Sequence, residues 1–168
     1  LSCLIKEGLT DDQMERATPV QGACLCGAVR FELVLPTLFC GHCHCSMCRR
    51  AHGAGYVTWI GVKVDQFSLT AGPDHLAAFS SSDHGKRSFC DQCGSALFCE
   101  SDNHPDVIDI VLANLHSPID RQPQAHYYFS DRADWTVVGD ELPRFGGDTG
   151  TEPLGPQTPS HCGTEKHA

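Results

Sequence analysis

The residues of this chain best suited to chemistry are its cysteines, of which there are eleven in 168 residues. Most fall into three clusters with one or two residues between neighbouring sulfurs: Cys24–Cys26, Cys40–Cys48 and Cys90–Cys93. Thiolates at such spacings are typical zinc ligands, and an odd number of cysteines excludes complete pairing as disulfides. We predict that seven of them hold two metal ions: Cys24, Cys26, Cys43, Cys45, Cys48, Cys90 and Cys93.

The pair Cys90–Cys93 is followed by Gly94, which is the spacing of a zinc knuckle. Two intervening residues let the turn place both sulfurs about 2.3 Å from one ion, and the glycine permits a positive φ. Such a pair needs a second pair, and Cys24 and Cys26 are the obvious donors. Four sulfurs make a closed tetrahedral site, so we expect a structural zinc that joins segments about 65 residues apart.

The middle cluster, Cys40–Cys48, does not by its spacing determine a complete set of four metal ligands. Three of its sulfurs can converge on one ion and leave the fourth position open, as in catalytic zinc sites; these are Cys43, Cys45 and Cys48. Alternatively Cys40 supplies a fourth ligand, or the fourth ligand is His42 or His44. Cys40 and Cys43 also have the spacing of a redox dithiol. Spacing alone leaves these alternatives open and favours the open site.

The charge of the chain limits its partners. Asp and Glu outnumber Lys and Arg by 21 to 12, which gives a formal net charge of −9 at pH 7. Phosphate backbones and anionic membrane surfaces repel such a protein, so we expect neither nucleic acid nor membrane as a partner. No apolar signal segment opens the chain, and no stretch approaches the ~20 apolar residues that cross a bilayer. We therefore predict metal chemistry in a reducing, cytoplasmic compartment.

Between the two ends of the chain the pattern is that of β-strands. Val29, Phe31 and Leu33 are spaced two apart, which gives a strand with one buried face. Further predicted strands are 56–62, 67–70, 76–80, 95–100, 107–115, 127–129 and 136–138. Asp109 interrupts the apolar run 107–115, where strand alternation can turn it outward. Short strands separated by turn residues predict a mostly β domain with few short helices.

The two ends differ from this pattern. Residues 1–19 read as an N-terminal arm, with capping-box spacing from Thr10 to Gln13 that predicts a short helix over 11–16. Residues 147–168 are rich in Gly and Pro and poor in apolar residues, so we expect a disordered tail. Cys3 and Cys162 lie in these ends and are not expected to bind metal.

Three segments carry a resemblance to a known family. They are Gly22-Ala23-Cys24-Leu25-Cys26-Gly27, His42-Cys43-His44-Cys45-Ser46-Met47-Cys48-Arg49-Arg50 and Phe89-Cys90-Asp91-Gln92-Cys93-Gly94. In order and separation they resemble the signature segments of the glutathione-dependent formaldehyde-activating enzyme (GFA) family, which includes the centromere protein V relatives. The resemblance covers residues 20–146. It implies a β-tent fold of small twisted antiparallel sheets around zinc.

The resemblance also implies roles for the cysteines. Cys24, Cys26, Cys90 and Cys93 would hold a structural zinc, and Cys43, Cys45 and Cys48 a second, reactive zinc. The family's namesake reaction joins glutathione to formaldehyde and gives S-hydroxymethylglutathione, a carbon–sulfur bond-forming step classed with the lyases. Zinc suits this chemistry because it lowers the pKa of a bound thiol or polarises the aldehyde oxygen. We therefore predict a carbon–sulfur lyase-type enzyme acting on a small thiol such as glutathione, or on its aldehyde adduct.

Two residues beside the middle cluster are candidates for substrate contact. Arg49 offers a planar fork that suits the carboxylates of glutathione, and His52 is a candidate acid–base group. Two other functions stay open: a non-catalytic zinc module for protein association, and a redox switch that uses Cys40 and Cys43. An open site of three sulfurs favours the enzyme, a closed site the module, and a disulfide the switch.

Overall fold

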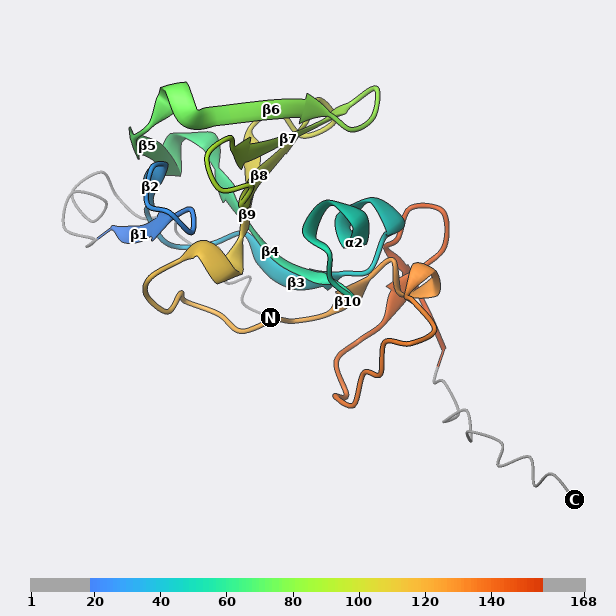
Figure 1. The fold of residues 1–168 in the computed structure, drawn as a ribbon. Helices are drawn as coiled ribbons and strands as arrows, with labels where there is room; N and C mark the ends of the chain where they lie inside the picture. Colours follow the sequence, from blue (N-terminus) through green and yellow to red (C-terminus); the bar gives the residue numbers. More distant parts are fainter. Residues whose placement is uncertain (1–18, 156–168) are drawn as a thin grey trace, which may run out of the picture.

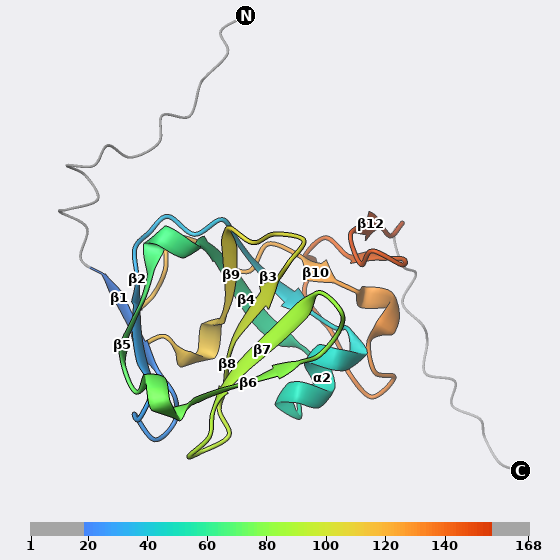
Figure 2. The same cartoon turned by 90° about the horizontal axis from the view of Figure 1, so that it is seen from above.

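The computed structural model describes residues 19–155, and most of the regular structure in them is β. The strands form a three-stranded sheet in the order β1-β2-β5, a seven-stranded sheet in the order β10-β3-β4-β9-β8-β7-β6, and the pair β11-β12. Within the described residues the one α-helix is α2 (Ser46–His52), which lies beside the long strands on the side away from β1, β2 and β5 (Figures 1 and 2). The prediction of a mostly β domain is confirmed.

The small sheet consists of β1 (Val20–Ala23), β2 (Arg30–Leu33) and β5 (Phe67–Ala71). Phe31 and Leu33 are buried while Arg30 is exposed, as the alternation in the sequence predicts. Gly22 stands opposite Phe31 in the antiparallel register, and a Cβ there would collide with the Phe31 ring. A glycine is therefore needed at position 22, because the Phe31 ring packs directly against the backbone of β1 there.

The large sheet is antiparallel except at one edge. Its strands are β3 (Phe39–Cys43), β4 (Val57–Lys63), β6 (Leu76–Ser80), β7 (Gly85–Cys90), β8 (Ala96–Ser101), β9 (Val107–Val111) and β10 (His126–Tyr127). At that edge β10 pairs in parallel with β3, while the other pairings are antiparallel as expected. The parallel pairing is possible because residues 44–125, which include most of the sheet, form the long connection between β3 and β10.

The sheet has two faces with separate apolar clusters. Ile108 and Ile110 of β9 join the main core between the large and small sheets, together with Cys40 of β3. Val111 and Trp59 belong to a second cluster on the opposite face, against α2. Because side chains alternate along a strand, Asp109 lies between Ile108 and Ile110 on the face of the second cluster.

Several predicted elements end elsewhere in the structure. The run 107–115 is a strand only to Val111, since Leu112–Asn114 form a 3₁₀ turn, and 136–138 are not in a strand. Residues 147–155, predicted to start the tail, include β12 (Glu152–Pro153), which pairs with β11 (Phe145–Gly146). The predicted helix over 11–16, Cys3 and Cys162 lie outside the described residues. Nowhere in 19–155 is there a helix long and apolar enough to span a membrane.

Candidate metal centres

The first cysteine group joins two hairpin turns. Cys24 and Cys26 lie in the turn between β1 and β2, and Cys90 and Cys93 lie at the turn between β7 and β8. All four sulfurs are within 4.8 Å of one another. The Sγ atoms of Cys24 and Cys26 are 3.5 Å apart, and those of Cys26 and Cys90 are 3.8 Å apart. The structure thus brings together the four residues predicted for one site.

These distances fit a metal ion and do not fit a disulfide. Four sulfurs at 2.3 Å from a central ion in tetrahedral geometry lie about 3.8 Å from one another, whereas disulfide sulfurs lie about 2.05 Å apart. All cysteines in the described part of the chain are free. The donor set is purely thiolate, so a borderline-soft ion such as zinc suits it.

Backbone and hydroxyl groups prepare this site for negative charge. The amide of Val29 donates to Cys24 Sγ at 3.3 Å, and the Ser95 hydroxyl lies 3.3 Å from Cys93 Sγ. The Ser95 side chain is the main reason why the pKa of the Cys93 thiol falls to about 5. Gly94 has a φ of 73°, which confirms the positive φ expected after Cys93, and Gly27 after Cys26 has a similar φ of 75°.

The second group forms where β3 runs into α2. Cys43 is the last residue of β3, Cys45 caps the helix and Cys48 lies in its first turn. Their sulfurs all lie within 4.8 Å of one another, and no fourth His, Cys, Asp or Glu ligand joins them within residues 19–155. The Cys48 amide donates to Cys45 Sγ at 3.3 Å, so the sulfur also serves as the helix N-cap. α2 ends at Gly53, whose φ of 60° is left-handed.

Three thiols this close cannot all ionise unaided. The thiols of Cys43 and Cys48, acting on the Cys45 sulfur, lower the pKa of Cys45 to about 2. The same contacts raise the pKa of Cys43, with burial adding to the effect. One sulfur thus takes the charge at the expense of its neighbours. A cation among them removes this conflict, which makes the cluster a fitting metal site.

Arg87 on β7 contributes to this site, and nothing in the sequence indicated it. Its Nη2 donates to Cys48 Sγ at 3.5 Å and its Nε donates to the Ser81 hydroxyl at 3.2 Å. Its Nη1 is buried and finds no partner among the described residues. A guanidinium beside three thiolates partly offsets their negative charge. Only the pairing of β7 with β8, and of β8 with β9, brings this residue, distant in sequence, to the cluster.

Tyr128 was also missed. Its phenol packs against the apolar cluster around Cys45 and Cys48, and burial and then the charges of the three cysteines raise its pKa. Its φ of 52° is the one positive value at a non-glycine residue within 19–155. A strained backbone at a bulky residue is frequent at functional sites. Gly150 makes room for it, since a Cβ there would collide with the Tyr128 ring.

The other residues considered as fourth ligands point elsewhere. Cys40 and Cys43 are three apart on β3, so they face opposite sides of the sheet, and Cys40 is buried in the main core. His42 Nδ1 lies 2.9 Å from the Thr58 hydroxyl. His44 Nε2 lies 2.8 Å from Nδ1 of His126, which belongs to β10. The structure therefore brings neither Cys40 nor these histidines into the group of three sulfurs.

The predicted substrate residues are held by the backbone around the cluster. Arg49 donates through Nε to the His44 carbonyl at 3.1 Å and through Nη2 to the Asp131 carbonyl at 3.0 Å. His52 lies in the last turn of α2, with Nδ1 2.9 Å from the Cys48 carbonyl, and burial lowers its pKa. Both residues are next to the second cluster, and their contact with a substrate stays a prediction.

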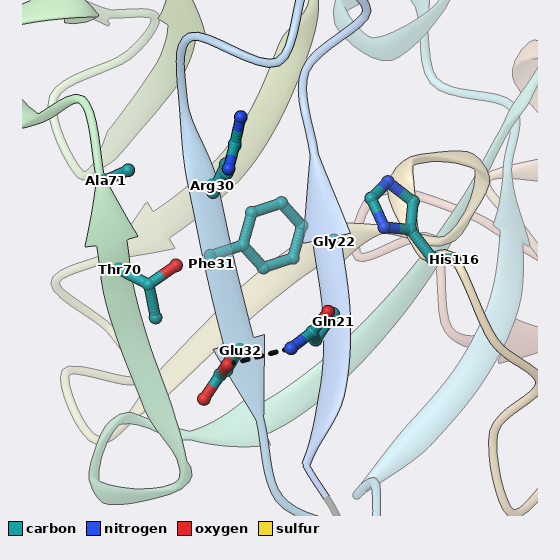
Figure 3. Close-up of a pocket in the computed structure, with 8 residues that line it drawn as sticks. All are labelled: Gln21, Gly22, Arg30, Phe31, Glu32, Thr70, Ala71 and His116. Atoms are coloured by element: carbon teal, nitrogen blue, oxygen red, sulfur yellow. Dashed lines mark hydrogen bonds between the residues drawn. The ribbon is translucent and has the colours of Figure 1, made fainter.

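Two surface cavities differ in their relation to these clusters. One lies on the small sheet, where it is lined by Arg30, Glu32, Thr70, His116 and their neighbours (Figure 3). None of the seven cysteines lines it, and Gln21 and Glu32 already bond to each other across it at 3.1 Å. The other lies on the large sheet and is lined in part by Phe39 and Cys99, which also pack against the second cluster.

The fold and these sites define a class: a mostly β protein with one closed group of four cysteines and one open group of three, each able to hold a metal ion. The sequence profile of the glutathione-dependent formaldehyde-activating enzymes matches residues 19–131, which is more than half of the chain. The chain belongs to this family, as the three signature segments indicated.

Individual relatives agree with this assignment. A Halomonas elongata protein named as a glutathione-dependent formaldehyde-activating enzyme is 29% identical over 127 residues, which cover 71% of this chain and 80% of the relative. A Schizosaccharomyces pombe protein named as an uncharacterised lyase is 31% identical over 85 residues, 46% of this chain and 55% of its own length. A crystal structure of a Rhodobacter sphaeroides protein superposes with a TM-score of 0.51 and 25% identity, covering 60% of this chain and 91% of the other.

Proposed function

We propose that this protein is a zinc-dependent carbon–sulfur lyase-type enzyme that joins a small thiol to an aldehyde or splits the adduct. Glutathione and formaldehyde are the proposed pair, since they give the family and the Halomonas relative their name. The observation that carries the proposal is the open second group, in which Cys43, Cys45 and Cys48 converge without a fourth ligand from the described residues. Three protein ligands are typical of catalytic zinc sites and four of structural ones.

Each cysteine group has its own part in the proposal. Cys24, Cys26, Cys90 and Cys93 would hold a structural zinc that joins two hairpin turns. Cys43, Cys45 and Cys48 would hold a second zinc, which would supply Lewis acidity and lower the pKa of a bound thiol. In the reaction the thiol sulfur forms a bond to the aldehyde carbon, the carbon–oxygen π bond breaks, and the thiol proton ends on oxygen. No oxidant or reductant is needed.

The residues around the second group assist in ways that the geometry supports. Arg87, through its hydrogen bond to Cys48, draws negative charge from the sulfurs and so favours approach of another anionic sulfur. Its Nη1, buried and without a partner among the described residues, leaves positive charge beside the sulfurs that no other group offsets. Trp59 and Val111 form an apolar wall beside the cluster, which keeps water from weakening these interactions.

The test compares two cysteines of one strand. NMR exchange spectroscopy follows the rate at which glutathione and formaldehyde interconvert with their adduct, above the uncatalysed rate. We expect wild-type protein and Cys40→Ser to accelerate the exchange, and Cys43→Ser to lose the acceleration while keeping its fold. A wild-type protein that retains both metals and gives no acceleration with any small thiol and aldehyde would favour the non-catalytic zinc module instead.

A further inference from the structure

The cavity on the large sheet is the feature that the proposed function leaves unexplained. Its volume is about 290 Å³, and its walls come from the start of β3, from β8 and from β9 with the turn before it. The lining residues are Leu38, Phe39, Cys99, Ser101, His104, Val107 and Asp109. This volume is near the lower end of the range for ligand pockets, about 300–1,000 Å³, and suits one part of a small ligand.

Asp109 is the carboxylate of this cavity. It lies in the middle of β9, between apolar neighbours, and no hydrogen bond or ion pair within residues 19–155 reaches its side chain. Burial raises the pKa of this carboxyl to about 6, against a smaller opposing effect of His104 and Arg87. A half-buried carboxylate without a partner destabilises a fold, so its presence in a cavity indicates a ligand group that pairs with it.

The sheet register connects this cavity to the second cysteine group. Arg87 on β7 pairs with Cys99 on β8, and Cys99 pairs with Asp109 on β9, so the three side chains share one face in a row. Two strand spacings separate Arg87 from Asp109, which is about 10 Å. Arg87 at the near end of the row touches Cys48 Sγ at 3.5 Å. The row therefore places the cavity and the second cysteine group on the same face of the sheet, with Cys99 in contact with both.

Building on the proposed function, we infer that this cavity receives the amino end of a peptide-like thiol, whose ammonium group pairs with Asp109 while its sulfur lies at the second cysteine group. The distance from an amino-terminal nitrogen, along one or two extended residues, to a cysteine side-chain sulfur is on the order of 10 Å, which is comparable to the row. An ammonium group is complementary to the carboxylate of Asp109 in charge and in hydrogen bonding. Thiols of two or three carbons fit the sulfurs but do not reach Asp109.

The experiment measures how the ligand's ammonium group and Asp109 depend on each other. Isothermal titration calorimetry of the full chain, purified with its metal under anaerobic conditions, gives the Kd for glutathione and for N-acetylglutathione, which lacks the charged amine. We expect wild-type protein to bind glutathione about tenfold more tightly, as one charge-assisted hydrogen bond in a partly open cavity provides. Asp109→Asn should bind both thiols with the weaker Kd. Asp106→Asn, which removes the same charge from an exposed turn, should keep the tenfold difference.

The outcomes separate the inference from the proposed function. Equal Kd values for the two thiols in wild-type protein, or a tenfold preference that survives Asp109→Asn, would overturn the role of the cavity and leave the thiol site at the second cysteine group intact. Failure of the metal-loaded wild-type protein to bind either thiol would overturn the proposed function and this inference with it.

Discussion

Replacing a sulfur of the first group should unfold the domain, whereas replacing an equally buried sulfur elsewhere should not. Cys90 and Cys40 are both 0% exposed, and both belong to the main core. Only Cys90 lies in a four-sulfur group, where it is 3.8 Å from Cys26, a residue 64 positions away. Cys90→Ser and Cys40→Ser therefore make the same chemical change at the same burial. Only Cys90→Ser removes a predicted metal ligand.

The expected losses of folding free energy in the two variants differ several-fold. A structural zinc contributes about 10 kcal/mol or more of folding free energy, which is comparable to the whole stability of a domain, about 5–15 kcal/mol. Cys40→Ser places a hydroxyl where a thiol was, at a cost of about 1–3 kcal/mol. At roughly 4 °C per kcal/mol for a domain of this size, Cys40→Ser should lower Tm by roughly 4–12 °C.

Differential scanning calorimetry with metal analysis of the same samples checks this contrast. Cys40→Ser should keep a cooperative transition and the wild-type metal content, while Cys90→Ser should show no cooperative transition or fail to accumulate in soluble form. Equal losses of Tm in the two variants, with unchanged metal content, would refute the structural role of the first group.

Three further predictions concern the second group and its surroundings. Cys45→Ser should stay folded and lose one metal ion per chain, as native mass spectrometry would show; unfolding equal to that of Cys90→Ser would contradict it. Arg87→Met should weaken binding of the more labile metal about tenfold or more in competition with a chelator, because it removes the hydrogen-bond donor to a sulfur ligand. Lys86→Met loses only an exposed ion pair with Glu100 and should not weaken metal binding. Because burial raises the pKa of Asp109 to about 6, above the ~3.9 of an unfolded chain, stability is lost as pH rises through 6. Asp109→Asn should therefore gain about 1 kcal/mol relative to wild type between pH 5 and pH 8 in urea unfolding, and a constant difference would contradict the burial of this carboxylate.

The sequence predicted the cysteine groups because their geometry is largely local. A pair of cysteines one or two residues apart and followed by glycine determines its own turn, and Gly27 and Gly94 have the positive φ that this requires. The two pairs Cys24–Cys26 and Cys90–Cys93 were assigned to one group because a tetrahedral site needs four ligands, and their four sulfurs do converge. Alternation also placed Phe31 and Leu33 in the core.

What could not be predicted depends on the register of distant strands. In the sequence Arg87 is one of an isolated pair of basic residues with Lys86, and nothing relates it to the cysteines until β7 pairs with β8. Asp109 is expected to face outward until the pairing of β9 shows which face it occupies. β10 is two residues long, too short for a periodic signal, although it sets the position of His126 against β3. Tyr128 depends on Gly150, a residue that the sequence assigned to the tail.

The central claim is that the second metal keeps a position open for a thiol, and zinc K-edge X-ray absorption tests it most directly. With one closed and one open site, the average zinc should have about 3.5 sulfur neighbours, completed by nitrogen or oxygen. Addition of glutathione should raise this number toward four, and Cys43→Ser should abolish the increase. An average of four sulfurs before any thiol is added, unchanged by glutathione, would contradict the open site and with it the enzymatic function.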